Sequence, residues 1–433
     1  MNNPPTVATL KSQVGQAVTL NGWLYNRRSS KAIHFLQFRD GTGVVQACVF
    51  KDKASPELFA MAGTLTQETS LTLSGMVVAD DRSPLGAEIH VDSLTVHTLT
   101  KDYPIVISDV QSNPDFLLDH RHLWIRSKKQ HALLRLRAYV INRLRNWLDD
   151  NGFICADTPI FTPNACEGTS TLFSVDYGED QTVYLSQSGQ LYNEATAQAF
   201  GKSYCFGPTF RAEKSKTRKH LREFWMLEPE MAYAGIDEVM KVEEAMVCSV
   251  VKDCLEHRLE DLKTLGADIA MLQGVKAPFT RLHYKEAREI ILKAGVDMKE
   301  MDDFGAPQEE ALMKEFKSPV FVHHFPTAIK AFYMERTKGD EKFCESVDLM
   351  AGNGVEICGG GARSWDLPWL ESQIDHHGLK REDFKWYLDL RRFGGQPSAG
   401  FGLGLERFVG WIAGTEHVRE CIPFPRTLYR VSP

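Results

Sequence analysis

Residues 203–230 read SYCFGPTFRAEKSKTRKHLREFWMLEPE and constrain the fold more than any other segment. Apolar, strand-like runs lie at both ends, and a long basic connection joins them, so the pattern predicts two paired strands with an extended loop. Between Arg211 and Arg222 the loop carries six Lys and Arg residues against one acid, Glu213, which gives a local charge of +5 with His220 neutral. Such a loop favours a phosphate-bearing ligand, although a solvated hairpin tip has a similar composition.

Two residues at the base of this loop suit a nucleotide. Arg211 directly follows the first strand-like run and Phe224 lies just inside the second, so both side chains can face one pocket. A guanidinium group binds a pair of phosphate oxygens, and an aromatic ring stacks on a base. From this segment alone, a nucleotide site and a plain hairpin are equally open interpretations.

A second motif, residues 398–414 (SAGFGLGLERFVGWIAG), is a glycine-rich strand that runs into an apolar helix, with Arg407 near the junction. It does not match the dinucleotide fingerprint, because Leu405 stands at the third glycine position. Glycines in a strand let a ligand or another strand approach the backbone closely, and helix packing is the alternative explanation.

Carboxylates gather in residues 345–363 (ESVDLMAGNGVEICGGGAR), where Glu345, Asp348 and Glu356 accompany a triple glycine and Arg363. Oxygen ligands shared with substrate phosphates are those that Mg²⁺ prefers, whereas solvated turns explain the same acids without a metal.

Small and amide-bearing side chains form a fourth cluster. Ser188, Gln190 and Asn193 lie in SQSGQLYNEA (residues 186–195), and Glu167 precedes them. These groups suit a small zwitterion, although they are also common on protein surfaces.

Two regions flank these motifs in different patterns. From Ala17 to about Leu99, five short alternating or apolar runs predict a closed Greek-key barrel of the kind that binds oligonucleotides, with a β-sandwich as the alternative. Paired strands mixed with helices then predict an antiparallel α+β domain. We expect a first domain over 1–104, a hinge over 105–127 and a second domain over 128–433.

Composition limits the class of protein. The 433 residues carry 50 Lys and Arg against 57 Asp and Glu, a formal charge of −7, so any polyanion must bind to local basic patches. No apolar run approaches the ~20 residues of a membrane span, and the start of the chain does not resemble a signal sequence. Nine cysteines without a CxxC pair argue against a disulfide framework. We therefore expect a cytoplasmic protein without a membrane partner.

Taken together and in this order, the motifs resemble those of class II aminoacyl-tRNA synthetases, in the subgroup for aspartate, asparagine and lysine. The helical pattern near Leu133 to Leu148, followed by FICADTPIFTP with Pro159, resembles the first motif, which builds a dimer interface in the family. Residues 210–230 resemble the second motif, and GFGLGLER resembles the third. The resemblance implies an OB-type anticodon-binding barrel of five strands, a catalytic domain with an antiparallel sheet flanked by helices, and a homodimer.

Within the subgroup the chain is most similar to the asparaginyl enzymes. Aspartyl enzymes usually place a proline and a lysine where this chain has Gly189 and Asn193. A lysine there would pair with a substrate carboxylate, whereas a neutral amide suits a carboxamide. The implied reaction joins L-asparagine to tRNA(Asn) with ATP and Mg²⁺, through an asparaginyl-adenylate. The closest alternative is a non-discriminating aspartyl enzyme, which also charges tRNA(Asn) with aspartate; an amide ligase and a non-catalytic RNA-binding relative are more distant alternatives.

The resemblance also implies roles at matching positions. Arg211 would contact the α-phosphate of ATP and Arg407 the γ-phosphate, as the catalytic residues, and Arg363 would bind the α-carboxylate of the amino acid. The remaining expected ATP contacts are Glu213, His220, Leu221, Phe224, Glu356 and Gly404, and the metal ligands are Asp348 and Glu356. The other expected amino-acid contacts are Glu167, Ser188, Gln190, Asn193 and Glu228, and the anticodon contacts are Arg27, Arg28, Phe35 and Gln46.

Two segments depart from the family pattern. Residues 323–334 read HHFPTAIKAFYM, so roles that the family builds at His324 to Ala328 do not transfer. Residues from about 235 to 319 match only loosely, and we assign no function to them.

Overall fold

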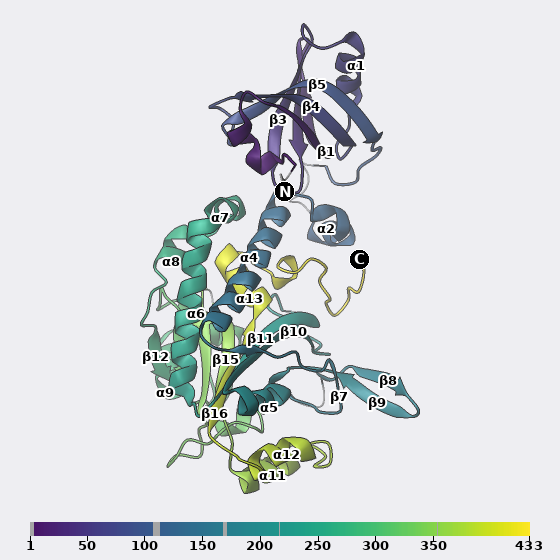
Figure 1. Cartoon of the computed structure of the whole chain (residues 1–433). Helices are drawn as coiled ribbons and strands as arrows, with labels where there is room; N and C mark the ends of the chain where they lie inside the picture. Colours follow the sequence, from purple (N-terminus) through teal and green to yellow (C-terminus); the bar gives the residue numbers. More distant parts are fainter. Residues whose placement is uncertain (1–3, 107–112, 168–170, 216, 353) are drawn as a thin grey trace. The chain divides into compact units, whose positions relative to one another are not determined.

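A closed barrel of five strands forms most of the first unit of the chain, Met1–Pro114 (Figure 1). The strands follow the order β1-β2-β3-β5-β4; β3 and β5 pair in parallel and the other described neighbours are antiparallel. This confirms the expected OB-type barrel. The strands are β1 (Ala17–Ser29), β2 (Ile33–Arg39), β3 (Val44–Phe50), β4 (Ser70–Ala79) and β5 (Ala87–Thr98).

Alternation of side chains explains why these segments close into a barrel. In β2, Leu36 and Phe38 are buried inside, whereas Phe35 lies half-buried on the opposite face. Two helices that the strand pattern did not predict complete the unit. They are the 3₁₀ helix η1 (Val7–Gln13) and helix α1 (Pro56–Thr64), which lies between β3 and β4.

The computed structural model describes residues 4–106, 113–167, 171–215, 217–352 and 354–433. The second unit is Asp115–Pro433. Within the described residues, we find no helix that is both long and apolar enough to span a membrane.

An eight-stranded sheet organises the second unit, with the strand order β12-β13-β14-β15-β16-β11-β10-β6. The six central strands are antiparallel to one another, as expected, but the edge strands β6 and β12 pair in parallel with β10 and β13. The sheet is therefore mixed. Its strands are β6 (Ile154–Cys155), β10 (Lys202–Phe210), β11 (Glu223–Ala232), β12 (Thr280–His283), β13 (Val320–His323), β14 (Ser346–Ala351), β15 (Val355–Arg363) and β16 (Ser398–Gly404).

Two long helices, α4 (Lys128–Asp150) and α6 (Ile236–His257), and the shorter α13 (Leu405–Ala413) pack on this sheet, and α4 contacts both of the others (Figure 1). The helical spacing read from the sequence explains the packing of α4, because Leu136 and Leu144 are fully buried in the largest core.

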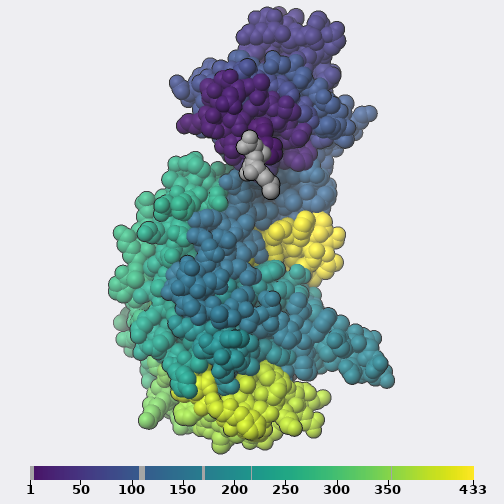
Figure 2. Space-filling model, in the orientation of Figure 1, coloured from purple at the N-terminus to yellow at the C-terminus, as the bar shows by residue number. Residues whose placement is uncertain are grey.

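A separate, smaller sheet has the order β7-β9-β8, and its β8–β9 hairpin projects from the rest of the unit (Figures 1 and 2). Its strands are β7 (Phe161–Thr162), β8 (Ser174–Gly178) and β9 (Gln181–Leu185). The remaining helices are α2 (Pro114–Asp119), α3 (Arg121–Trp124), α5 (Gln190–Phe200), α7 (Leu259–Leu265), α8 (Ile269–Gln273), α9 (Tyr284–Lys293), α10 (Ala306–Met313), α11 (Leu367–His376), α12 (Lys385–Arg392), and the 3₁₀ helices η3 (Thr327–Ile329) and η4 (Val418–Glu420).

The segment expected as a hinge, 105–127, differs from a free linker in its second half. Residues 107–112 lie outside the described part of the chain, but α2 and α3 follow directly. Arg121 of α3 is only 1% exposed, and its guanidinium donates to the carbonyl oxygens of Ile422 and Pro423 at 2.9 and 2.8 Å. This half therefore packs against the C-terminal segment of the second unit.

Candidate active site

A cavity of about 390 Å³ opens beside β11, β15 and β16. Its walls also include the loop between Arg211 and Arg222. All the residues that we singled out in the second unit as catalytic, ATP, metal or amino-acid contacts line this cavity, with the exception of Asn193. They are Glu167, Ser188, Gln190, Arg211, Glu213, His220, Leu221, Phe224, Glu228, Asp348, Glu356, Arg363, Gly404 and Arg407.

The hairpin at 203–230 forms as the sequence predicts. Strands β10 and β11 pair from Lys202↔Met231 to Phe210↔Glu223, and the backbone N–H of Arg211 then donates to the carbonyl of Arg222 at 3.0 Å. The Arg211 guanidinium lies 5.4 Å from the ring centroid of Phe224. Lys216, a member of the basic loop, lies outside the described residues.

Arg211 is a charged residue of the cavity whose guanidinium group is available to bind an anion. Its buried Nε has no hydrogen-bond partner, and it makes no ion pair with any described residue. Burial alone lowers its pKa, but the carboxylates of Glu167 and Glu213 outweigh that effect and raise the pKa, so the guanidinium stays charged.

Other cations of the cavity are already paired. Lys219 donates to a carboxylate oxygen of Glu309 at 2.6 Å. The guanidinium of Arg407 lies 3.4 Å from a carboxylate oxygen of Glu356. Burial and the neighbouring Arg407 lower the pKa of His220, so this ring stays neutral near pH 7.

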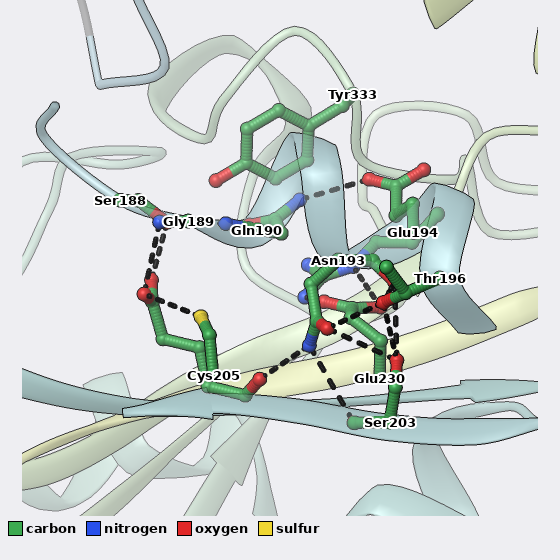
Figure 3. Close-up of polar contacts among 12 residues, drawn as sticks. Ser188, Gly189, Gln190, Asn193, Glu194, Thr196, Ser203, Cys205, Glu230 and Tyr333 are labelled. Carbon is green, nitrogen blue, oxygen red and sulfur yellow. Dashed lines mark hydrogen bonds and ion pairs between the residues drawn. The ribbon is translucent and has the colours of Figure 1, made fainter. Parts of the chain in front are cut away.

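The end of the cavity where we expected the amino acid to bind is organised around Glu228. Its carboxylate accepts hydrogen bonds from the Ser188 hydroxyl, the Gly189 backbone N–H at 2.9 Å and the Cys205 thiol at 3.5 Å (Figure 3). Burial raises the pKa of Glu228 although these donors oppose the shift. An added Cβ at Gly189 would lie 2.3 Å from the Thr158 hydroxyl oxygen, so this turn has no room for a side chain.

Gln190 is held by a buried network behind the cavity. Its amide nitrogen donates to Glu194 at 3.1 Å (Figure 3), and Glu194 also accepts from Tyr387 at 2.8 Å and Arg391 at 2.7 Å. Because the amide nitrogen is engaged there, the carbonyl oxygen of Gln190 is the atom left for a ligand donor.

Arg363 forms a buried two-point ion pair with Glu230, through its Nη2 and Nε. Its guanidinium lies 5.5 Å from the Tyr333 ring centroid, and the Tyr333 hydroxyl donates to Glu167 at 3.1 Å. Burial raises the pKa of Glu230 to about 7, against the lowering effect of Arg363.

The three acids of residues 345–363 separate into two places. Asp348 and Glu356 line the cavity. Gly359 lies beside both: an added Cβ would be 2.7 Å from Glu356 Oε1 and 3.3 Å from Asp348 Oδ1, so the missing side chain leaves space between two carboxylates. Glu345 does not reach the cavity and instead lies 3.4 Å from a ring nitrogen of His324.

The residues that we expected to contact the anticodon lie on two faces of the barrel wall. Arg28 pairs with Phe35 and Gln37 pairs with Gln46, so the side chains of Arg28, Phe35 and Gln46 share the outer face. Arg27 pairs with the buried Leu36 and therefore lies on the other face, where its guanidinium donates to Ser29 at 3.0 Å.

Both units match known families. Residues 113–428 match the family described as tRNA synthetases class II (D, K and N), and residues 18–96 match the OB-fold nucleic acid binding domain. The chain belongs to the class II tRNA synthetases.

This synthetase resembles its relatives over its whole length. It is 50% identical over 425 residues to an asparagine–tRNA ligase of Desulforamulus reducens, covering 98% of each chain. It is 48% identical over 435 residues to an asparagine–tRNA ligase of Chloroflexus aurantiacus, covering 99% of this chain and 98% of the other. The structure of asparaginyl-tRNA synthetase from Pyrococcus horikoshii complexed with asparaginyl-adenylate matches with a TM-score of 0.96 and 40% identity, over 100% of both chains. The resemblance seen in the ordered motifs is confirmed, and the synthetase is an aminoacyl-tRNA ligase.

Asn193 requires a correction. We expected its amide to face the substrate, but it is fully buried and absent from the cavity lining. Its nitrogen donates to the Glu228 backbone carbonyl at 2.6 Å, and its oxygen accepts from Thr196 at 2.8 Å and Ser203 at 3.0 Å (Figure 3). With these hydrogen bonds made inside the protein, Asn193 supports the β11 backbone rather than reading a ligand directly.

The sequence pattern missed several residues that line the cavity of the synthetase. Lys330 and Tyr333 come from the segment IKAFYM, and Asp303 comes from the segment to which we assigned no function. Helix α10, which also lies in that segment, brings Glu309 to Lys219. The one available signal was the Lys and Tyr in IKAFYM, which we used only to mark a departure from the family.

Proposed function

We propose that this synthetase joins L-asparagine to tRNA(Asn) with ATP, through an asparaginyl-adenylate, and releases pyrophosphate and AMP. The observation that carries the proposal is Arg211. Its guanidinium makes no ion pair with any described residue, lies 5.4 Å from the Phe224 ring centroid, and lines the same cavity as Glu228. The names of the full-length relatives support asparagine as the amino acid.

In the first step, the carboxylate of the amino acid attacks the α-phosphorus of ATP in line. The bond between that phosphorus and the bridging oxygen breaks, and pyrophosphate leaves with the bond's electrons. Arg211 lies where the two reacting groups would meet and can neutralise the charge that builds on the α-phosphate. Phe224 would stack on adenine. Arg407 would bind the terminal phosphate once its guanidinium has moved away from Glu356.

We expected Arg363 to bind the α-carboxylate, but its charge is already compensated by Glu230. We therefore assign the α-carboxylate to Arg211, and the side-chain end of the amino acid to the neighbourhood of Arg363. A carboxylate side chain placed there would lie beside the buried acids Glu228 and Glu230, whereas a neutral carboxamide adds no charge. This difference favours asparagine over aspartate.

Asp348 and Glu356 are the residues that would hold Mg²⁺. Their oxygens flank the space beside Gly359, and a hard divalent cation prefers such oxygen ligands together with phosphate oxygens. When bound, the metal would supply positive charge next to the phosphates. The chain's own contribution there is to fix two carboxylates on adjacent strands, β14 and β15.

In the second step, a terminal ribose hydroxyl of the tRNA attacks the adenylate carbonyl, and AMP leaves. The tRNA would also be read by the outer face of the barrel, where Phe35 is available to stack on an anticodon base and Arg28 to meet phosphate. Gln46 keeps its carbonyl oxygen for a base, because its nitrogen donates to Glu88 at 3.0 Å.

We further propose a homodimer formed through α4 and the segment that follows it. Ile154, Ile160 and Phe161 are exposed apolar side chains in that segment, which is unfavourable unless another surface covers them.

The proposal is tested by amino-acid-dependent ATP–pyrophosphate exchange, with asparagine and aspartate assayed side by side. Exchange with asparagine alone supports the assignment, and exchange with aspartate alone moves the chain to the aspartyl enzymes. Arg211→Ala should lower the exchange rate by at least about 100-fold, since it removes charge stabilisation from the transition state. Arg218→Ala is the matched control, because that arginine belongs to the same loop but is largely exposed, and the ion pair that it makes among the described residues is with the exposed Glu416.

A further inference from the structure

Lys330 places an ammonium group directly on one of the two proposed metal-binding carboxylates. Its Nζ donates to Asp348 Oδ2 at 2.7 Å, and it lies 3.9 Å from the ring centroid of Phe325. The side chains of Lys330 and Asp348 are 18% and 12% exposed, so this pair is shielded from water and from screening by salt. The ring beneath it and the carboxylate beside it fix the ammonium in place.

The second carboxylate is compensated in the same way. Glu356 lies 3.4 Å from a guanidinium nitrogen of Arg407, so each acid already has its own cation. Among the described residues, no group of three or more His, Cys, Asp or Glu side chains is arranged to hold a metal ion.

A divalent cation that used both carboxylates would lie within a few ångströms of this ammonium. Like charges at such a distance in a buried site repel each other strongly, and the metal would also need the Asp348 oxygen that Lys330 occupies. The phosphates of a nucleotide can take up the displaced ammonium, and they supply the oxygen ligands that two carboxylates lack.

We propose that Lys330 is a built-in counter-cation of the Asp348–Glu356 pair, which keeps divalent metal off this site until nucleotide phosphates draw the ammonium away from Asp348. The metal then enters together with the nucleotide. This inference rests on the proposed function for its nucleotide, and it gives a role to a residue that the sequence motifs did not single out. Lys330 is thus a positioning residue that acts through Asp348.

The test is binding of Mn²⁺, followed by its electron paramagnetic resonance signal, to the full-length protein without nucleotide. The measurement is made at about pH 8, where ordinary carboxyl groups are ionised and ordinary lysines are protonated. We expect weak binding by the wild type and by Lys330→Arg, and at least about tenfold tighter binding by Lys330→Met and Lys330→Gln. Equal or weaker binding by both neutral variants would overturn the proposal.

Lys285→Met is the matched control. Lys285 also lies over an aromatic ring, 4.4 Å from the Phe343 centroid, and near an acid, Asp340 at 3.6 Å, but it does not line the cavity. Its removal should leave Mn²⁺ binding unchanged, and an equal gain in this variant would refute a specific role of Lys330. Far-ultraviolet circular dichroism identifies any variant that does not fold. If one of Lys330→Met and Lys330→Gln does not fold, Mn²⁺ binding by the other one decides the test.

A second arm adds a non-hydrolysable ATP analogue. The wild type should then bind Mn²⁺ tightly, and the ratio of affinities with and without the analogue should fall by about tenfold or more in Lys330→Gln. An unchanged ratio contradicts the proposal. Since no amino acid or tRNA takes part, this outcome is separate from that of the exchange assay, which tests the proposed function.

Discussion

Glu243 of α6 is a fully buried carboxyl group, and neither of its oxygens has a hydrogen-bond partner in the part of the chain that the structure describes. Burial, followed by the nearby Asp348 and Glu356, raises its pKa well above the ordinary value of 4.5. Above that pH the unfolded chain releases the proton whereas the folded protein keeps it, so this group lowers stability as pH rises.

Glu243→Gln should therefore raise the free energy of unfolding at about pH 8. The expected gain is about 1.4 kcal/mol for each pH unit between the ordinary pKa of Glu243 and its raised pKa in the folded wild type, counted up to pH 8. The gain should disappear near pH 4, where Glu243 of the wild type is protonated in both the folded and the unfolded state. Urea unfolding at the two pH values measures it, with the exposed Glu256→Gln on the same helix as control. An equal effect at both pH values would show that Glu243 is not a neutral buried acid.

Gly189 is a second residue whose role depends on its immediate surroundings. A Cβ there would lie 2.6 Å from Cys205 Sγ and 2.3 Å from the Thr158 oxygen, while its N–H holds Glu228. Gly189→Ala should raise the KM for asparagine by about tenfold or more, because Glu228 is displaced by a shift of this turn. The KM for ATP should change much less. Gly207→Ala on β10, which has open space at its Cβ, should leave both values unchanged in the exchange assay.

At the scale of elements, α10 holds the long loop of the β10–β11 hairpin. Lys219 of the loop donates to Glu309 of α10 at 2.6 Å and also to the Gly354 carbonyl. Both side chains of the pair are mostly buried, so their attraction is weakly screened. This contact links a loop of the synthetase motif to a segment that matches the family loosely.

Glu309→Gln should loosen the loop, because it removes the charge that holds Lys219. Amide hydrogen exchange in residues 217–222 should accelerate by about tenfold in the ligand-free protein, corresponding to roughly 1.4 kcal/mol of lost stabilisation. Glu310→Gln, an exposed neighbour on the same helix, provides the comparison. Unchanged exchange in Glu309→Gln would mean that other contacts hold the loop.

At the scale of the whole molecule, each unit has a core of its own. The barrel core draws only on residues of Met1–Pro114, and the larger cores only on Asp115–Pro433. A change on the barrel surface should therefore leave the first chemical step intact. Phe35→Ala should leave asparagine-dependent pyrophosphate exchange unchanged and reduce kcat/KM for tRNA by about tenfold or more, because one stacked base is worth about 1–3 kcal/mol.

Aminoacylation kinetics with varied tRNA measures this effect. Met76→Ala, which removes an exposed apolar side chain from β4, is the control. A loss of exchange activity in Phe35→Ala would contradict independent units, and normal tRNA kinetics would remove Phe35 from the proposed anticodon face.

Local pattern was sufficient for the barrel strands, for the first long helix of the second unit and for the hairpin at 203–230. Alternation identified the five barrel strands and helical spacing identified α4, whereas the resemblance to the family brought Arg211, Glu356 and Arg407 together in one expected site. These features were predictable because periodicity and motif spacing depend on residues close together in the chain.

The tertiary structure alone decided where each side chain points and which distant segments meet. Asn193 belongs to the right segment but turns away from the cavity, Arg27 lies on the opposite face from Arg28, and Lys330 and Glu309 reach the site from segments without a recognised motif. Strand register fixes the face of the sheet on which a side chain lies, and a shift of one position along the strand moves the side chain to the opposite face. Ion pairs between segments far apart, such as Lys219 with Glu309, depend on the packing of the whole domain and leave no periodic signal in the sequence.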